Sequence, residues 1–202
     1  MARPGRPREF DIDRALEAAL HVFWEHGYEA TSLAQLRAAL GISSASFYAA
    51  FASKEELFIR IVERYAGSYA RVTSPLADED LSSREAIERA LRASVAMQTD
   101  SSHPLGCLFV VTGTLNAPED ARVHKVLAEH RAVDRQNILA CIERAMTRGE
   151  LPADTNAPAL EATFHMFLAG ISTEARDGAT AETLDAAVDQ LMTIWDTLAR
   201  QG

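Results

Sequence analysis

The sequence has few cysteines and no long apolar run. Its two cysteines, Cys107 and Cys141, cannot build the dense disulfide framework of small secreted domains. The longest apolar run, residues 105–111, is far too short to span a bilayer. The basic start leads into an amphipathic pattern and not into the apolar stretch of a signal peptide. These absences predict a soluble, cytoplasmic protein without membrane contact.

Motifs for catalysis and for cofactors are also missing. The sequence contains no phosphate-binding loop, no GxSxG and no glycine-rich dinucleotide fingerprint. Its six histidines are dispersed, with neither H-x3-H nor HExxH spacing. We therefore expect no catalytic residues, no cofactor and no metal site, and we predict that the protein is not an enzyme.

An excess of basic residues is absent as well, since the formal net charge is −9. Whether this net charge excludes nucleic-acid binding depends on where the acidic and basic residues lie in the chain. Residues 1–54 are neutral, with six basic and six acidic side chains, whereas residues 65–202 hold 12 basic and 20 acidic ones. The acidity therefore belongs to the C-terminal part, and it does not exclude nucleic-acid contact by the N-terminal part.

Residues 31–54 predict two short helices joined by a tight turn, followed by a third helix. Gly41 suits the end of the first, because glycine enters the left-handed conformation of a helix cap without steric cost. Ser43 is the expected N-cap of the second, and Ser53 with Glu56 predicts a capping box on the third. The apolar face of the first helix comprises Leu33, Leu36, Ala39 and Leu40. This order of elements is that of a helix-turn-helix.

The stretch GYEATSLAQLRAALGISSASFYAAFASKEELF, residues 27–58, resembles the DNA-binding motif of the tetracycline-repressor family of bacterial regulators. The resemblance covers about the first third of the chain. It implies a ligand-responsive regulator, most simply a repressor, that binds a palindromic double-stranded DNA operator as a homodimer. A small apolar or aromatic effector would shift the fourth helix like a pendulum and release the operator.

The outward face of the second short helix is the expected reader of base edges. It presents Ser44, Ala45, Ser46, Tyr48 and Ala49. None of these can make the bidentate base contacts of Arg, Lys, Asn or Gln, although serines can donate single hydrogen bonds and alanines can meet thymine methyl groups.

Further DNA contacts come from flanking positions. The resemblance implies that Tyr48 and Lys54 contact phosphates, and that Thr31 or Ser32 binds a phosphate at a helix N-terminus. Gln35 can add a contact from the preceding helix.

Residues 1–9 form a basic, proline-rich arm. Arg3, Arg6 and Arg8 would enter the minor groove, where narrow A·T segments concentrate negative potential. The alternative is a disordered tail without a role.

The whole chain predicts an all-α fold of about nine helices. Residues 1–53 would form the arm and the helix-turn-helix domain, and residues 54–202 a helical domain for ligand binding and dimerisation. We expect further helices from Phe10, Lys54 (to about Thr73), Ser82 or Ser83, Asn116–Pro118 (to about Arg148), Asn156 and Thr180. Residues 100–116 could be a strand by composition, but a strand would have no partner here, so we predict a loop with a short buried helix.

The ligand site is predicted less directly. His130 and Asn137 lie on the apolar face marked by Val126, Leu127, Val133 and Ile138, where they either find polar partners or line a cavity. His165 poses the same alternative. The full predicted set is Tyr65, Tyr69, Met97, His103, Cys107, Phe109, His130, Asn137, Phe164 and His165.

Cys107 has two interpretations. With His103 it could form a redox-sensing or nucleophilic pair, which would make the protein a redox-sensing repressor. Its apolar neighbours favour a buried, unreactive thiol instead. The GCL motif at residues 106–108 also resembles a stretch beside the ligand cavity in some members of the family.

The apolar faces of the last two predicted helices are wider than packing on a single core requires. The resemblance places the dimer interface there. The predicted residues are Met166, Ala169, Gly170, Leu191, Met192 and Trp195. The sequence leaves the effector, the operator, the regulated gene and the choice between repression and activation open.

Overall fold

The computed structural model describes residues 12–112 and 120–200, and all regular elements within these ranges are helices. The described residues form nine α-helices and one 3-10 helix, which confirms the predicted all-α fold with an N-terminal helix-turn-helix. The bounds are α1 Ile12–His26, α2 Leu33–Leu40, α3 Ser44–Phe51, α4 Lys54–Ala66, η1 Tyr69–Ala77, α5 Ser83–Gln98, α6 Leu108–Val111, α7 Ala121–Arg148, α8 Ala157–Arg176 and α9 Ala181–Ala199.

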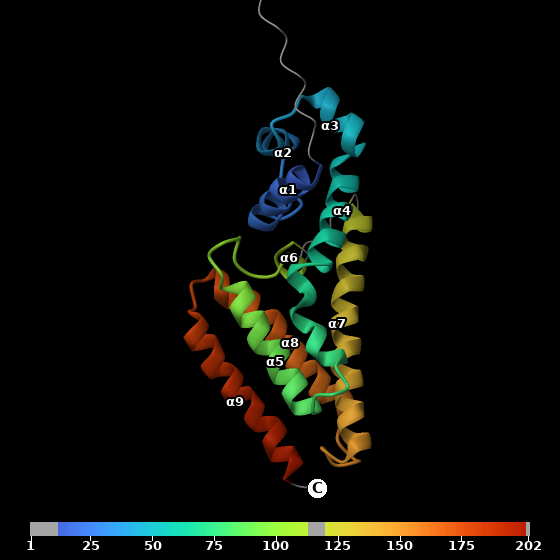
Figure 1. The fold of residues 1–202 in the computed structure, drawn as a ribbon, viewed down its shortest axis with the longest axis vertical. Helices are drawn as coiled ribbons and strands as arrows, with labels where there is room; N and C mark the ends of the chain where they lie inside the picture. Colours follow the sequence, from blue (N-terminus) through green and yellow to red (C-terminus); the bar gives the residue numbers. More distant parts are fainter. Residues whose placement is uncertain (1–11, 113–119, 201–202) are drawn as a thin grey trace, which may run out of the picture.

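The molecule is elongated, with α1–α3 at one end and α5, α8 and α9 at the other (Figure 1). Helix α4 leads from the small end toward the body, and α7 packs against it and continues along the body (Figure 1). The short helix α6 lies at the junction, where it contacts α1, α4, α7 and α8. Within the described residues, no helix is long and apolar enough to cross a membrane.

The helix-turn-helix is specified by local capping signals. Ser32 Oγ accepts a hydrogen bond from Gln35 N at 3.2 Å, and the Gln35 side chain accepts one from Ser32 N at 2.8 Å, which completes a capping box on α2. Gly41 ends α2 with φ +65°, in the left-handed region. Ser43 Oγ caps α3 by accepting from Ser46 N at 3.2 Å.

The capping box predicted for α4 is only half present. Ser53 Oγ accepts a hydrogen bond from Glu56 N at 3.0 Å, as predicted. The Glu56 carboxylate does not return to the cap, because it accepts a hydrogen bond from Arg122 on α7. A tertiary ion pair has replaced the second local bond.

The predicted helix from Lys54 to about Thr73 was wrong in its second half. The α-helix ends at Ala66, and the chain continues as the 3-10 helix η1. Gly67 follows the last helical residue, and the Ser68 hydroxyl donates a hydrogen bond to Arg64 O at 2.7 Å. Glycine and serine are poor helix formers, and a side-chain bond of this kind competes with the helical ladder.

Other predicted boundaries have mixed outcomes. Ser82, Asn156 and Thr180 cap α5, α8 and α9 as predicted, and Gly149 ends α7 with φ +73°. The expected helix starts at Phe10 and at Asn116–Pro118 lie outside the described residues.

Two clusters of buried side chains fill the molecule. The first, which we call the aromatic core, joins α1–α4, α6 and the first turns of α7. Its ring-bearing members are Phe23, Trp24, Tyr28, Phe47, Phe51, Phe58, Tyr65 and Phe109. The second, the aliphatic core, joins η1, α5, the second half of α7, α8 and α9, with Phe164 and Trp195 as its buried aromatic residues. Since α4 shares the core of α1–α3, a domain boundary at residue 53 remains a prediction.

Candidate nucleic-acid interface and effector cavity

Helix α3 presents a small, uncharged face to the outside. Phe47 and Phe51 are buried beneath it, and this fixes which side of the helix is free. The exposed residues are the predicted Ser44, Ala45, Ser46, Tyr48 and Ala49, and Tyr48 is 52% exposed. Ser32 and Gln35, at the start of α2, are exposed as well. Seven of the predicted DNA contacts are therefore exposed.

Two predicted phosphate contacts are placed differently. Thr31 is only 1% exposed, and its hydroxyl donates a hydrogen bond to Gly27 O at 2.6 Å. It therefore supports the turn after α1, and Ser32 alone is the N-cap. Lys54 is half-buried, with Nζ 4.2 Å from the centre of the Tyr28 ring, and burial lowers its pKa. Its phosphate contact remains a prediction, as do those of Arg3, Arg6 and Arg8, which lie outside the described residues.

A cavity lies between η1, α5, α6, α7 and α8, with about 480 Å³ of empty space, part of it open to solvent. Its wall is formed by Ala70, Val72, Thr73, Ser94, Met97, Gln98, Cys107, Phe109, Val110, Arg131, Asp134, His165, Leu168 and Ala169. Four predicted ligand residues lie on this wall, namely Met97, Cys107, Phe109 and His165. Ala169, which we had assigned to the dimer interface, lies there as well.

The other six predicted ligand residues do not line the cavity. Three of them surround the indole of Trp24, with ring centroids at 4.9 Å for Tyr65, 4.9 Å for Tyr69 and 4.5 Å for His103. The aromatic core therefore already uses these rings for packing.

The remaining three are on α7 and α8. The His130 ring stacks on the ring of the wall residue Phe109, with centroids 4.7 Å apart, and Asn137 is half-buried and is not part of the wall. Phe164 packs toward Trp195 in the aliphatic core, with centroids 6.2 Å apart. Val133, predicted to face inward with His130, is 50% exposed.

The sequence interpretation missed the charged residues of the wall, Arg131 and Asp134. They continue the three- and four-residue spacing of the buried Leu127 and Ile138, so periodicity alone places them inward. Their charge hid that signal, because charged residues are rarely buried without a partner. The inward face of α7 is therefore rotated from the expected His130 and Asn137.

Burial shapes the chemistry of this wall. It lowers the pKa of Arg131, and Nη1 of that residue donates a hydrogen bond to Phe109 O at 2.6 Å. Burial raises the pKa of the Asp134 carboxyl. Burial also lowers the pKa of the His165 imidazole, and repulsion by the positive charges of Arg135 and Arg131 lowers it further. His165 is therefore largely neutral at pH 7, and the wall offers a few polar groups on a mainly apolar surface.

Cys107 is held in the wall by its backbone. Its N–H donates to Ser172 Oγ at 2.8 Å, and that hydroxyl donates to Gln98 Oε1 at 2.6 Å. Burial raises the pKa of the Cys107 thiol, which disfavours the reactive thiolate. Cys141 belongs to the aliphatic core and is also a free thiol. The redox alternative gains no support from this geometry.

The segment that lines the cavity also holds helix α1. Trp24 Nε1 donates a hydrogen bond to Gly106 O at 2.9 Å, next to the wall residue Cys107. Arg176 on α8 donates to Leu105 O at 3.2 Å and to the carbonyl oxygens of Trp24 and Glu25 at 3.0 and 2.9 Å. A displacement of this segment would therefore reach the DNA-binding end directly.

The predicted dimer residues fall into two groups. Met166 is 66% exposed, and Gly170 has open space beside it. Met192 and Trp195 are 2% and 1% exposed, because α9 packs this stripe against α5 and α8 inside one subunit. Met192 and Trp195 therefore leave almost no surface for a partner, and their assignment to the interface stays a prediction that this packing does not support.

Leu191 is also nearly buried, at 9% exposure. Ile194, at 40% exposure, is the large apolar residue that α9 presents outward. Together with Met166 and Gly170 it marks the outer side of α8 and α9 as the candidate interface.

Comparison with known proteins agrees with this arrangement. A family model described as "Bacterial regulatory proteins, tetR family" matches residues 15–61, and one described as "Tetracyclin repressor-like, C-terminal domain" matches residues 84–193. The HTH-type transcriptional repressor ComR of Escherichia coli (strain K12) is 31% identical over 197 residues, which cover 97% of this chain and 94% of ComR. The repressor BdcR of the same organism is 30% identical and covers 91% of this chain and 88% of BdcR.

Among solved structures, a cysteine mutant of the TetR family transcriptional regulator CifR, complexed with 26bp double-strand operator DNA, is 37% identical. It superposes with a TM-score of 0.88 and covers 95% of this chain and 100% of that one. Family models and relatives thus span both the helix-turn-helix and the helical body. The chain belongs to the tetR family of bacterial regulatory proteins, which are DNA-binding transcription factors and not enzymes.

Proposed function

We propose that this protein is a transcriptional repressor that binds a palindromic operator as a homodimer and leaves it when a small apolar or aromatic effector fills the cavity. The observation that carries the proposal is the link from the cavity wall to α1 through Gly106 and Trp24. The names of ComR and BdcR as repressors support the direction of regulation, and the operator complex of CifR supports binding to operator DNA.

The DNA contact would be made by the outward face of α3. Its serine hydroxyls and alanine methyl groups would contact base edges, and the exposed Tyr48 and Ser32 would meet phosphates. Small side chains let the backbone approach the groove closely but provide little direct readout. Specificity then depends also on the basic arm and on DNA shape.

Release would follow from movement at the junction. An effector between α5, α7 and α8 would press on Phe109 and Cys107, whose segment holds Trp24 on α1. Two recognition helices bind two half-sites only at a separation of about 34–36 Å, so a small rotation of α1–α4 is enough to lose one of them. The effector need only bind the released state more tightly than the DNA-bound state.

The wall indicates the chemical class of the effector. Most of its side chains are apolar, and Ser94 Oγ is buried there without a hydrogen-bond partner among the described residues. A buried hydroxyl without a partner costs about 1–3 kcal/mol, which a ligand can recover. We infer a compact apolar or aromatic molecule with one hydrogen-bonding group.

Selection from a random duplex library tests the DNA half of the proposal. The retained sequences should contain inverted half-sites whose centres lie one helical turn apart. Ser46→Glu should abolish retention by repelling phosphates, and Ser102→Glu, at an exposed serine between α5 and α6, should not. A pool without inverted repeats, or equal loss in both variants, would contradict the proposal.

Sedimentation tests the dimer. Met166→Glu and Ile194→Glu should convert dimers to monomers, because each places a charge in an interface that must exclude water. Val133→Glu, at a comparably exposed apolar residue on α7, is the matched control and should leave the dimer intact. A wild-type protein that is monomeric at micromolar concentration would overturn this part.

A further inference from the structure

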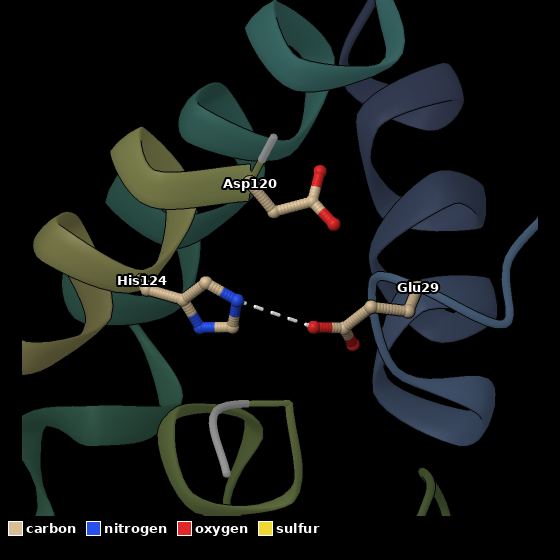
Figure 2. A group of neighbouring side chains, drawn as sticks. All are labelled: Glu29, Asp120 and His124. Carbon is tan, nitrogen blue, oxygen red and sulfur yellow. Dashed lines mark ion pairs between the residues drawn. The ribbon is translucent and has the colours of Figure 1, made fainter. Parts of the chain in front are cut away.

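Three potential metal ligands converge between the DNA-binding end and the body. Glu29 lies in the turn between α1 and α2, Asp120 directly precedes α7, and His124 lies in the first turns of α7. Each offers one ligand atom, and the three atoms lie within 4.8 Å of one another. Figure 2 shows the three side chains facing one another across the gap between these elements. No spacing motif predicts this set, because Glu29 is distant from the other two in the sequence.

His124 is the member that points to a missing ligand. Its side chain is only 11% exposed, and both ring nitrogens are buried without a hydrogen-bond partner among the described residues. Nε2 lies 3.4 Å from Glu29 Oε1, a charge contact without a hydrogen bond (Figure 2). A buried polar group left in this way costs about 1–3 kcal/mol. A cation between the two atoms would satisfy the nitrogen.

The Asp120 carboxylate does not cap helix α7. An aspartate at the N-cap commonly accepts a hydrogen bond from the first turn of its helix. Asp120 is the N-cap of α7 and makes no such side-chain bond. Its carboxylate instead faces the gap shared with Glu29 and His124 (Figure 2).

The positive charge of Lys54, which interacts with Asp120 and Glu29, does not fill this gap. Burial lowers the pKa of Lys54, and the negative charges of Asp120 and Glu29 oppose that shift. Its ammonium lies over the Tyr28 ring, and within the described residues it forms no ion pair with either carboxylate. Lys54 therefore reduces the negative potential of the cluster without supplying a bond to its oxygens.

We propose that Glu29, Asp120 and His124 bind a divalent transition-metal ion of the Zn²⁺ class. Zn²⁺ takes His nitrogen and carboxylate oxygen at about 2.0–2.2 Å, so neighbouring ligands of a tetrahedral ion lie about 3.3 Å apart. The contact of 3.4 Å between His124 and Glu29 already has this separation. Glu29 is an exposed side chain and Asp120 a partly exposed one, and both can rotate to close the set. Water would complete the coordination.

The ligand types select the metal. Mg²⁺ and Ca²⁺ favour sites made of oxygen, whereas imidazole suits Zn²⁺ and related ions. A bound ion would tie the turn before α2 to the start of α7, and an ion that binds only the folded chain stabilises it.

Titration calorimetry and thermal unfolding of the tag-free, full-length protein test the site, with Zn²⁺ as the probe and Mg²⁺ as the comparison. We expect one Zn²⁺ per chain and a rise in Tm that Mg²⁺ does not reproduce. His124→Gln, Asp120→Asn and Glu29→Gln should each weaken Zn²⁺ binding by roughly tenfold or more and remove the rise in Tm. His26→Gln, at an exposed histidine at the end of α1, is the matched control and should bind like the wild type.

Absorption of the Co²⁺-loaded protein gives an independent readout, since tetrahedral coordination produces strong visible bands that the three variants should lose. Asp120→Asn and Glu29→Gln alter accessible side chains, so they keep the test valid if His124→Gln fails to fold. The proposal is overturned if Zn²⁺ does not bind, or if the His26 control loses binding equally. It is also overturned if His124→Gln lowers Tm by the same amount with and without Zn²⁺. That result would mean that His124 stabilises the fold only through its contact with Glu29.

Discussion

The two cores of this molecule differ in what they join. The aromatic core packs rings from the DNA-binding helices against Phe109, which also lines the cavity. The aliphatic core packs α5, α8 and α9 with few rings, and it lies behind the candidate dimer surface. The cavity opens where they meet, with Phe109 on one side and Leu168, which packs on the aliphatic core, on the other. In the mechanism proposed above, the large rigid rings would pass a displacement to the DNA-binding helices, while the aliphatic core would keep the scaffold fixed.

Truncating one ring in each core should produce the largest effects. Phe58→Ala removes a ring whose centroid lies 4.9 Å from Phe23 and 5.0 Å from Tyr28, and Phe164→Ala removes a buried ring from the other core. Each should lower the free energy of unfolding by about 3–5 kcal/mol. Urea titration measures the loss. A much smaller loss for Phe58→Ala would mean that the aromatic core is not a packed unit.

Replacing one tryptophan in each core should separate signalling from stability. Trp24→Phe removes the donor to Gly106 O and should cost about 1–3 kcal/mol, because that carbonyl loses its partner. It should also change operator affinity, since the segment that lines the cavity then holds α1 less firmly. Trp195→Phe is the matched change in the aliphatic core. Fluorescence anisotropy should show altered operator binding for Trp24→Phe and not for Trp195→Phe. Equal changes in the two variants would mean that the aromatic core has no special role in DNA binding.

The free energy of unfolding should depend on pH at acidic values partly through the carboxylate of Glu88. Arg92 and Arg84 hold the pKa of Glu88 below its ordinary value by hydrogen bonds and charge, although burial opposes them. A carboxyl with a lowered pKa stabilises the fold above its ordinary pKa of 4.5, and this contribution disappears as the pH falls through the lower, folded value. Glu88→Gln should cost about 0.5–1 kcal/mol at pH 7 and little at low pH, since partly exposed pairs contribute little. A loss independent of pH would assign Glu88 a packing role.

The smallest expected effect concerns one hydroxyl at the DNA surface. Tyr48→Phe should weaken binding to operator and to random DNA equally, by about 0.5–1.5 kcal/mol, because phosphate contacts carry no sequence information. Tyr69→Phe, whose hydroxyl donates to Glu17 at 3.2 Å, is the control and should leave DNA binding unchanged. Loss confined to the operator would show that Tyr48 reads bases.

Much of the DNA-binding end could be predicted because its signals are local. Ser32, Gly41 and Ser43 act within one turn of their own positions, so the sequence contains the full cause of the turn. The outward face of α3 followed from Phe47 and Phe51 in the same way. Thr31 was misplaced because its choice of partner, Gly27 O, depends on the conformation of the preceding turn.

The cavity was less predictable because its wall comes from five separate elements. Cys107 was found through a family resemblance, but Arg131 and Asp134 were passed over because they are charged. The role of Trp195 was hard to predict because an apolar stripe looks the same in the sequence whether it faces a neighbouring helix or a partner subunit. Only the packing of α9 on α5 and α8 distinguishes these.

The most direct test of coupling between cavity and DNA is to fill the cavity without an effector. Met97→Trp places a large ring in the space beside Phe109, while Val133→Trp adds the same ring to an exposed site on α7. Anisotropy with a labelled operator obtained by selection gives the affinity, and sedimentation confirms that both variants remain dimers. Our account predicts that Met97→Trp binds operator at least about tenfold more weakly than the wild type, equivalent to about 1.4 kcal/mol, with Val133→Trp unchanged. Wild-type affinity in a folded, dimeric Met97→Trp protein would contradict it.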